Sequence, residues 1–171
     1  SDLVTAVNYA AQSNLTLSTA QTIPVTGTFN SANLASGGGL TINPMQTLTL
    51  SSGGLLLQSG NAGVSGGILT ASNEFRVYVP SASGSDVATI SSVITGTNPF
   101  TKAGAGILAL TAQSPYAATT TVNQGTLRLS SGATNTLLVG LAASGQALVV
   151  NAGGTLDLNG GRSEEHTSEL Q

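Results

Sequence analysis

Short runs of alternating apolar and polar residues recur along the chain. Each run begins with a small or polar residue and usually has Leu, Ile or Ala at its third and fifth positions. The runs are QTLTL at Gln46, GILTA at Gly67, DVATI at Asp86, GILAL at Gly106, GTLRL at Gly125 and GTLDL at Gly154. The first five starts are evenly spaced, and the last follows after a longer gap. An apolar period of two predicts a β-strand with one buried face.

This alternation predicts which side chains face the core. The expected inward residues are Leu48, Leu50, Leu69, Ala71, Ala88, Ile90, Leu108, Leu110, Leu127, Leu129, Leu156 and Leu158. The residues expected to face outward are Thr49, Thr70, Thr89, Ala109, Arg128 and Asp157.

A strand pattern that returns about every twenty residues predicts an all-β parallel solenoid, in which each period forms one rung of two or three strands. Residues 1–161 would then form roughly eight rungs stacked about 4.8 Å apart. The alternative all-β fold is an antiparallel sandwich. A sandwich has no reason to repeat one strand pattern at this period, so the solenoid is favoured.

Composition supports many short strands joined by tight turns. Of the 171 residues, 40% are apolar, 22 are Gly and only 6% are charged. Gly, Ser, Thr and Asn disfavour helices and suit turns or strand surfaces. There is no Cys, which excludes disulfides and thiolate metal sites. The net charge of −3 offers no basic field for nucleic acid or an anionic membrane.

The segment from Phe100 to Ala133, FTKAGAGILALTAQSPYAATTTVNQGTLRLSSGA, resembles the autotransporter-associated β-strand repeat. The resemblance rests on Thr-Lys, Gly-x-Gly, the Ile/Leu alternation, a loop Tyr and Thr-x-Val-Asn-x-Gly-Thr-Leu. The chain departs from the pattern at residues 115–118, in the loop. The resemblance implies a right-handed parallel β-helix from the exported passenger region of a large bacterial surface protein.

Four regions are expected. Residues 1–99 would form degenerate rungs, 100–133 the clear repeat, and 134–161 a loop and a partial further repeat. The fragment would be an internal slice of a passenger, open at both ends. Residues 162–171, RSEEHTSELQ, can be encoded by AGATCGGAAGAGCACACGTCTGAACTCCAG, which resembles a translated sequencing-library adapter. We therefore interpret this charged tail, with the sole His166, as a non-native artefact.

The charged residues predict surface pairs rather than a reactive centre. Arg128 and Asp157, about one period apart, are expected to pair on the surface, as are Glu74 and Arg76 on one strand face. Lys102 is expected to have a structural role at a bend. Asp86 is placed at a turn.

No catalytic, cofactor-binding or metal-ligating residue is assigned, and no cofactor is expected. The glycine-rich runs match no phosphate-binding loop, since no GxxxxGK[ST] sequence is present. A carbohydrate surface formed by Tyr78, Phe100 and Tyr116 is not assigned, because these residues are scattered along the sequence.

The sequence thus predicts a non-catalytic, rigid stalk or adhesive segment of an exported surface protein, which is not an enzyme. Its expected partners are neighbouring rungs and, through loops such as 134–145, a glycan, host-surface or matrix ligand. Neither nucleic acid binding nor membrane insertion by this segment is expected. The expected location is the cell surface or exterior, with outer-membrane anchoring through another region. The alternative is a polysaccharide-active lyase or glycosidase, which would need clustered carboxylates on adjacent rungs.

Overall fold

The computed structural model describes residues 13–58, 62–80, 87–129 and 147–159, and these residues form strands and turns without a helix. No helix that could cross a membrane occurs among them. Every strand pair is parallel, and fourteen strands join in one sheet that winds around the molecule. The strands are β1 (Asn14–Leu17), β2 (Gln21–Ile23), β3 (Gly27–Leu34), β4 (Gly39–Leu57), β5 (Gly63–Ala71), β6 (Phe75–Tyr78), β7 (Val87–Ile90), β8 (Val93–Thr95), β9 (Phe100–Ala103), β10 (Ile107–Leu110), β11 (Thr120–Val122), β12 (Gly125–Leu129), β13 (Leu148–Val150) and β14 (Gly154–Asp157).

The strands form three stacked faces, and the chain visits them in turn. The first face contains β1, the end of β3, the end of β4, β6, β9, β11 and β13. The second contains β2, the beginnings of β4 and β5, β7, β10, β12 and β14. The third contains the beginning of β3, the middle of β4, the end of β5 and β8. The long strands β3, β4 and β5 pass from one face to the next.

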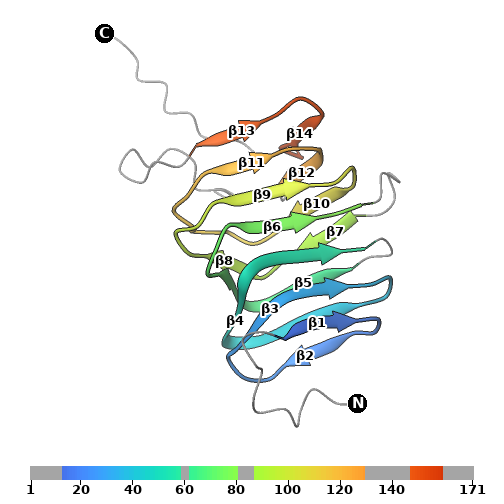
Figure 1. The fold of residues 1–171 in the computed structure, drawn as a ribbon, viewed down its shortest axis with the longest axis vertical. Helices are drawn as coiled ribbons and strands as arrows, with labels where there is room; N and C mark the ends of the chain where they lie inside the picture. The colour runs from blue at the N-terminus through green and yellow to red at the C-terminus, as the bar shows by residue number, and fades with distance from the viewer. Residues whose placement is uncertain (1–12, 59–61, 81–86, 130–146, 160–171) are drawn as a thin grey trace.

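The molecule is a parallel β-solenoid whose turns are spaced by about 22 residues (Figure 1). In the described residues, the first and second faces each carry seven stacked strand segments. The predicted fold class is therefore confirmed, and the seven levels in the described residues come close to the roughly eight rungs expected of residues 1–161. The middle rungs are longer than the sequence period suggested, as the pairing of Phe75 with Phe100 and of Val64 with Ile90 shows. The loop at 134–145, Asp86 and the tail 162–171 lie outside the described residues, so the interpretation of that tail stays a prediction.

Parallel, in-register pairing stacks like side chains into columns inside the solenoid. Leu40, Val64, Ile90 and Leu110 follow one another on successive rungs of the second face, and each is at most 1% exposed. Full burial of one such side chain contributes about 1.5–3 kcal/mol to folding. A rung is therefore stable only when another rung covers it.

Most of the predicted inward positions are confirmed. The nine residues from Leu48 to Leu127 in that set are buried, and Leu129 and Leu156 are partly buried against the core. Leu158 is a wrong prediction: it is 39% exposed, because it follows β14, which ends the described strand path. Ala109 is also wrong, since it is only 8% exposed although it was expected outside. Its small methyl group lies between Thr89 and Arg128 on the adjacent rungs.

The six repeated runs belong to two faces. The runs at Gln46 and Gly67 pair with each other on the third face. The runs at Asp86, Gly106, Gly125 and Gly154 stack on the second face, where their described residues pair position for position. The step from Gly67 to Asp86 is consequently not one rung.

Candidate functional site

Lys102 occupies a core position in a column of otherwise apolar residues. On the first face it pairs with Val77 on one side and with Val122 on the other. All three side chains are 0% exposed. Since an isolated buried ammonium group is very costly, its hydrogen bonds decide whether the position is tolerable.

The Lys102 ammonium is satisfied by three backbone carbonyls at the corner of the solenoid. Its Nζ donates to the oxygens of Ala103 at 3.0 Å, Gly104 at 2.7 Å and Gln124 at 3.0 Å. Ala103 and Gly104 belong to one corner, and Gln124 belongs to the same corner of the next rung. Burial lowers the pKa of Lys102 to about 8. Lys102 therefore joins two rungs, which agrees with the structural role predicted for it.

The sequence prediction did not anticipate that Lys102 is buried. The available signal was the alternation: Phe75, Val77 and Val79 face inward on β6 and beyond it, and Phe100, Lys102 and Gly104 occupy the aligned positions. A charged residue at an inward position predicts a local set of buried acceptors.

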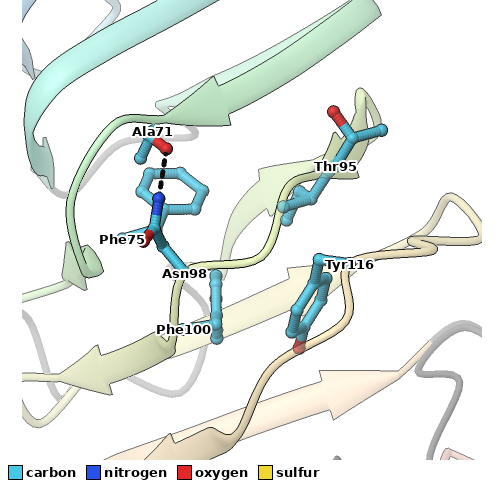
Figure 2. Close-up of a pocket in the computed structure, with 7 residues that line it drawn as sticks. Ala71, Phe75, Thr95, Asn98, Phe100 and Tyr116 are labelled. Carbon is cyan, nitrogen blue, oxygen red and sulfur yellow. Dashed lines mark hydrogen bonds between the residues drawn. The ribbon is translucent and has the colours of Figure 1, made fainter. Parts of the chain in front are cut away.

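Three aromatic rings pack together at the other end of these strands, where β6 and β9 begin (Figure 2). The ring centroids of Phe75 and Phe100 are 5.5 Å apart, in an edge-to-face arrangement, and those of Phe100 and Tyr116 are 5.7 Å apart. The Tyr116 hydroxyl lies 2.5 Å from Thr120 Oγ1. Burial raises the pKa of Tyr116 to about 12, an effect that the hydrogen bond with Thr120 opposes.

The aromatic rings are a core cluster and not a carbohydrate surface. Phe100 is 1% exposed and Tyr116 is 4% exposed, whereas Tyr78 is 49% exposed. The hollow beside the rings encloses about as much space as one water molecule needs. Across its rim, Asn98 Nδ2 donates to the carbonyl oxygen of Ala71 at 2.9 Å (Figure 2).

Glu74 and Arg76 form the predicted ion pair and also bind the next rung. Arg76 Nη2 lies 2.5 Å from Glu74 Oε2, and Nε of the same side chain donates to that oxygen at 2.8 Å. Thr101, which pairs with Arg76 across the sheet, donates to Glu74 Oε1 at 2.5 Å. Hydrogen bonds from Arg76 and Thr101 lower the pKa of Glu74 below its usual value.

Arg128 and Asp157 form the second predicted ion pair. They are register partners on β12 and β14, and Arg128 Nε donates to Asp157 Oδ2 at 2.7 Å. Asp157 Oδ1 also accepts a hydrogen bond from the Asn159 amide at 2.9 Å. These two bonds, that from Arg128 first, lower the pKa of Asp157.

The two carboxylates in the described part of the chain are too far apart to act together. Glu74 precedes β6, and three rung steps separate β6 from β13, which lies in the same turn as Asp157. Three steps of about 4.8 Å exceed the ~9.5 Å upper limit for paired acids in inverting glycosidases. Within these residues, no group of three metal-ligating side chains occurs either.

The family comparison identifies residues 100–129 as a passenger-associated-transport-repeat. This segment contains Lys102, Gly104, Tyr116 and Arg128, so the corner described above lies within the repeat. The match supports an autotransporter passenger repeat protein, and this family implies exposure outside the cell or at its surface. Neither a curated protein nor a solved structure matches the chain.

Proposed function

We propose that this chain is a non-catalytic, rigid stalk segment within the passenger of an exported bacterial surface protein. One observation supports this most strongly: successive rungs pair in parallel and in register through the passenger repeat, so rungs can be added without a change of fold. Each added repeat lengthens such a segment by one rung, and the segment separates the parts of the protein that are attached to its two ends.

Repetition of the corner contacts supports a rigid rod rather than a flexible one. Beyond the Lys102 bonds, Asn73 Nδ2 donates to the carbonyl oxygen of Ser51 at 2.7 Å, and Asn151 Nδ2 donates to Asn123 Oδ1 at 2.6 Å. Each of these bonds joins adjacent turns of the solenoid. Resistance to bending follows from many such links distributed over several corners.

The proposal is tested by adding one rung. Phe100 pairs with Thr120, so an in-frame duplication of residues 100–119 supplies one complete period. The duplicated protein should be longer by about 4.8 Å, as measured by small-angle X-ray scattering, and should keep its thermal stability. A duplication of residues 100–118 is the matched control. It shifts the register by one residue and reverses the faces of the following strand, so it should unfold that region.

Two results would overturn the stalk proposal. One is a duplicated protein of unchanged length, which would show that the added rung does not stack. The other is cleavage of a polysaccharide by the purified chain that Asp157→Ala abolishes. Surface exposure and anchoring are proposed with the stalk, and antibodies against residues 100–129 should label intact cells without permeabilisation.

A further inference from the structure

The third face carries a column of four threonines on successive rungs. Thr28 pairs with Thr49, Thr49 with Thr70, and Thr70 with Thr95. All four are partly exposed, and they alternate with inward residues, among them Leu48, which is 0% exposed. These hydroxyl and methyl groups therefore lie along one line on the outside of the solenoid.

A second column of β-branched residues runs beside the first. Thr47 pairs with Ile68, and Ile68 pairs with Val93. Thr26 extends this column, because its Oγ1 accepts a hydrogen bond from the Thr47 amide at 3.1 Å. We call the two columns together the threonine array, which consists of Thr26, Thr28, Thr47, Thr49, Ile68, Thr70, Val93 and Thr95.

The array has two regular repeats because it is built on a parallel sheet. Neighbouring rungs lie about 4.8 Å apart, and alternate residues of one strand lie about 6.7 Å apart. Some of its side chains are fixed by hydrogen bonds: Thr70 Oγ1 donates to the carbonyl oxygen of Thr95 at 2.9 Å, and Thr26 Oγ1 donates to Gln46 Oε1 at 3.1 Å. β-Branched side chains also have few rotamers. The array is thus ordered before any partner binds.

The chemistry of the array restricts the kind of partner. No charged residue occurs between Asp2 and Glu74, and β8 has none, so the array has no charge with which to select an ionic partner. It also lacks aromatic residues, on which flat sugar rings stack. What remains is a periodic pattern of hydroxyl and methyl groups, which fits a neutral partner that is itself periodic.

We propose that the threonine array binds the surface of ice. Ice is uncharged, and its faces present rows of oxygen atoms at repeats similar to those of the array. Hydroxyl groups can hydrogen-bond to these oxygens, and the methyl groups fill the spaces between rows. Because the array is rigid, little side-chain entropy is lost on binding. This function is additional to that of a stalk and needs only a rod whose third face is open.

The test uses the full chain and two matched substitutions on one strand. Thr49→Tyr places a large ring in the centre of the array, whereas Thr41→Tyr places the same ring on the second face, where Thr41 contacts Ser65 at 3.2 Å. Freezing-point depression, ice-crystal shape and inhibition of ice recrystallisation are measured for each protein. The parent and Thr41→Tyr should be active, and Thr49→Tyr should lose the activity. Thermal unfolding shows that each variant is folded.

Thr49→Ser is the second variant, in case Thr49→Tyr does not fold. It keeps the hydroxyl group and removes one methyl group, so it should weaken ice binding without unfolding the protein. Absence of ice activity in the folded parent protein would overturn the proposal, as would equal loss in the Thr41 and Thr49 variants. Binding to crystalline cellulose, without effects on ice, would also overturn it and assign the array to a polysaccharide.

Discussion

Lys102 Nζ donates a hydrogen bond to the carbonyl oxygen of Gln124 at 3.0 Å, across the junction between two successive rungs. The same ammonium group also holds the Gly104 carbonyl at 2.7 Å. One buried side chain thereby fixes the relative position of two corners of the repeat. Its loss should affect both rungs.

Replacement of Lys102 by Met should destabilise the protein by about 2 kcal/mol. The apolar side chain fills the space, but the carbonyls of Ala103, Gly104 and Gln124 lose a charged donor. The Ala103 oxygen keeps its bond from the Val79 amide, whereas a buried carbonyl left without any donor costs about 1–3 kcal/mol. Removal of the buried charge offsets part of this loss. Urea unfolding measures the change, and hydrogen exchange of the Asn123 amide, which donates to the Lys102 carbonyl, locates it. Arg76→Met, at an exposed pair, is the control and should cost much less than Lys102→Met, because solvent screens that pair.

Stability should rise as the pH increases from about 8 to 10.5. The pKa of Lys102 is about 8 in the folded protein and 10.5 when unperturbed. In this interval the unfolded chain binds a proton that the folded protein does not, so a higher pH favours folding. This stability is fully present above 10.5 and is lost as the pH falls through 8. If Lys102→Met shows the same rise of stability with pH, Lys102 is not the group that causes it.

Tyr116 should produce the opposite slope at higher pH. Its pKa is raised from 10.0 to about 12 by burial, so the folded protein keeps a proton that the unfolded chain releases. Stability is therefore full below pH 10 and is lost as the pH rises through 12. Unfolding of Tyr116→Phe, measured by circular dichroism over this range, should lack this loss.

Substitution of Gly104 by Ala should be far more harmful than substitution of Gly153. Both glycines have positive φ, +80° and +90°, so Ala costs about 1–2 kcal/mol at either position. At Gly104 the added Cβ would also lie 2.4 Å from the Val79 carbonyl oxygen on the preceding rung, whereas at Gly153 it meets nothing within 4 Å. Thermal melting of the two variants checks the difference, and equal melting temperatures would disprove the close approach.

The Arg128–Asp157 pair should contribute little energy. Both side chains are about one-third exposed, at 34%. A double-mutant cycle with Arg128→Ala and Asp157→Ala should give only a small coupling energy, as is usual for ion pairs at the surface. The coupling should decrease with added salt, as screening requires. A coupling energy as large as that of a buried ion pair, insensitive to salt, would show that solvent does not reach the pair.

The sequence was sufficient to predict six of the strand segments and the register between most of them. Residues of the runs at Gly106 and Gly125 pair position for position because their alternation and spacing are regular. It was insufficient between Gly67 and Asp86, where two similar runs belong to different faces. A short alternation describes any strand with one buried face, so it does not say which side of the solenoid the strand occupies.

The site was only partly predictable for a related reason. Both ion pairs followed from spacing, since Arg128 and Asp157 hold equivalent positions in their runs. Burial of Lys102 was missed although the alternation along β9 marks its position as inward, because the carbonyls that satisfy its charge carry no sequence signal. The threonine column on the third face could not be predicted from the sequence either. Thr28 and Thr95 are distant in the chain, but only three rung steps separate them in the solenoid.

The uncharged stretch before Glu74 divides the solenoid into two chemically different halves. The half with β1 to β5 contains no group that titrates between acid and alkali and no ion pair that salt could screen. Its shape should be the same in fresh water, brine or an acidified medium. A response of the rod to pH or salt is therefore expected in the half that begins at Glu74, where all the described ionic contacts lie.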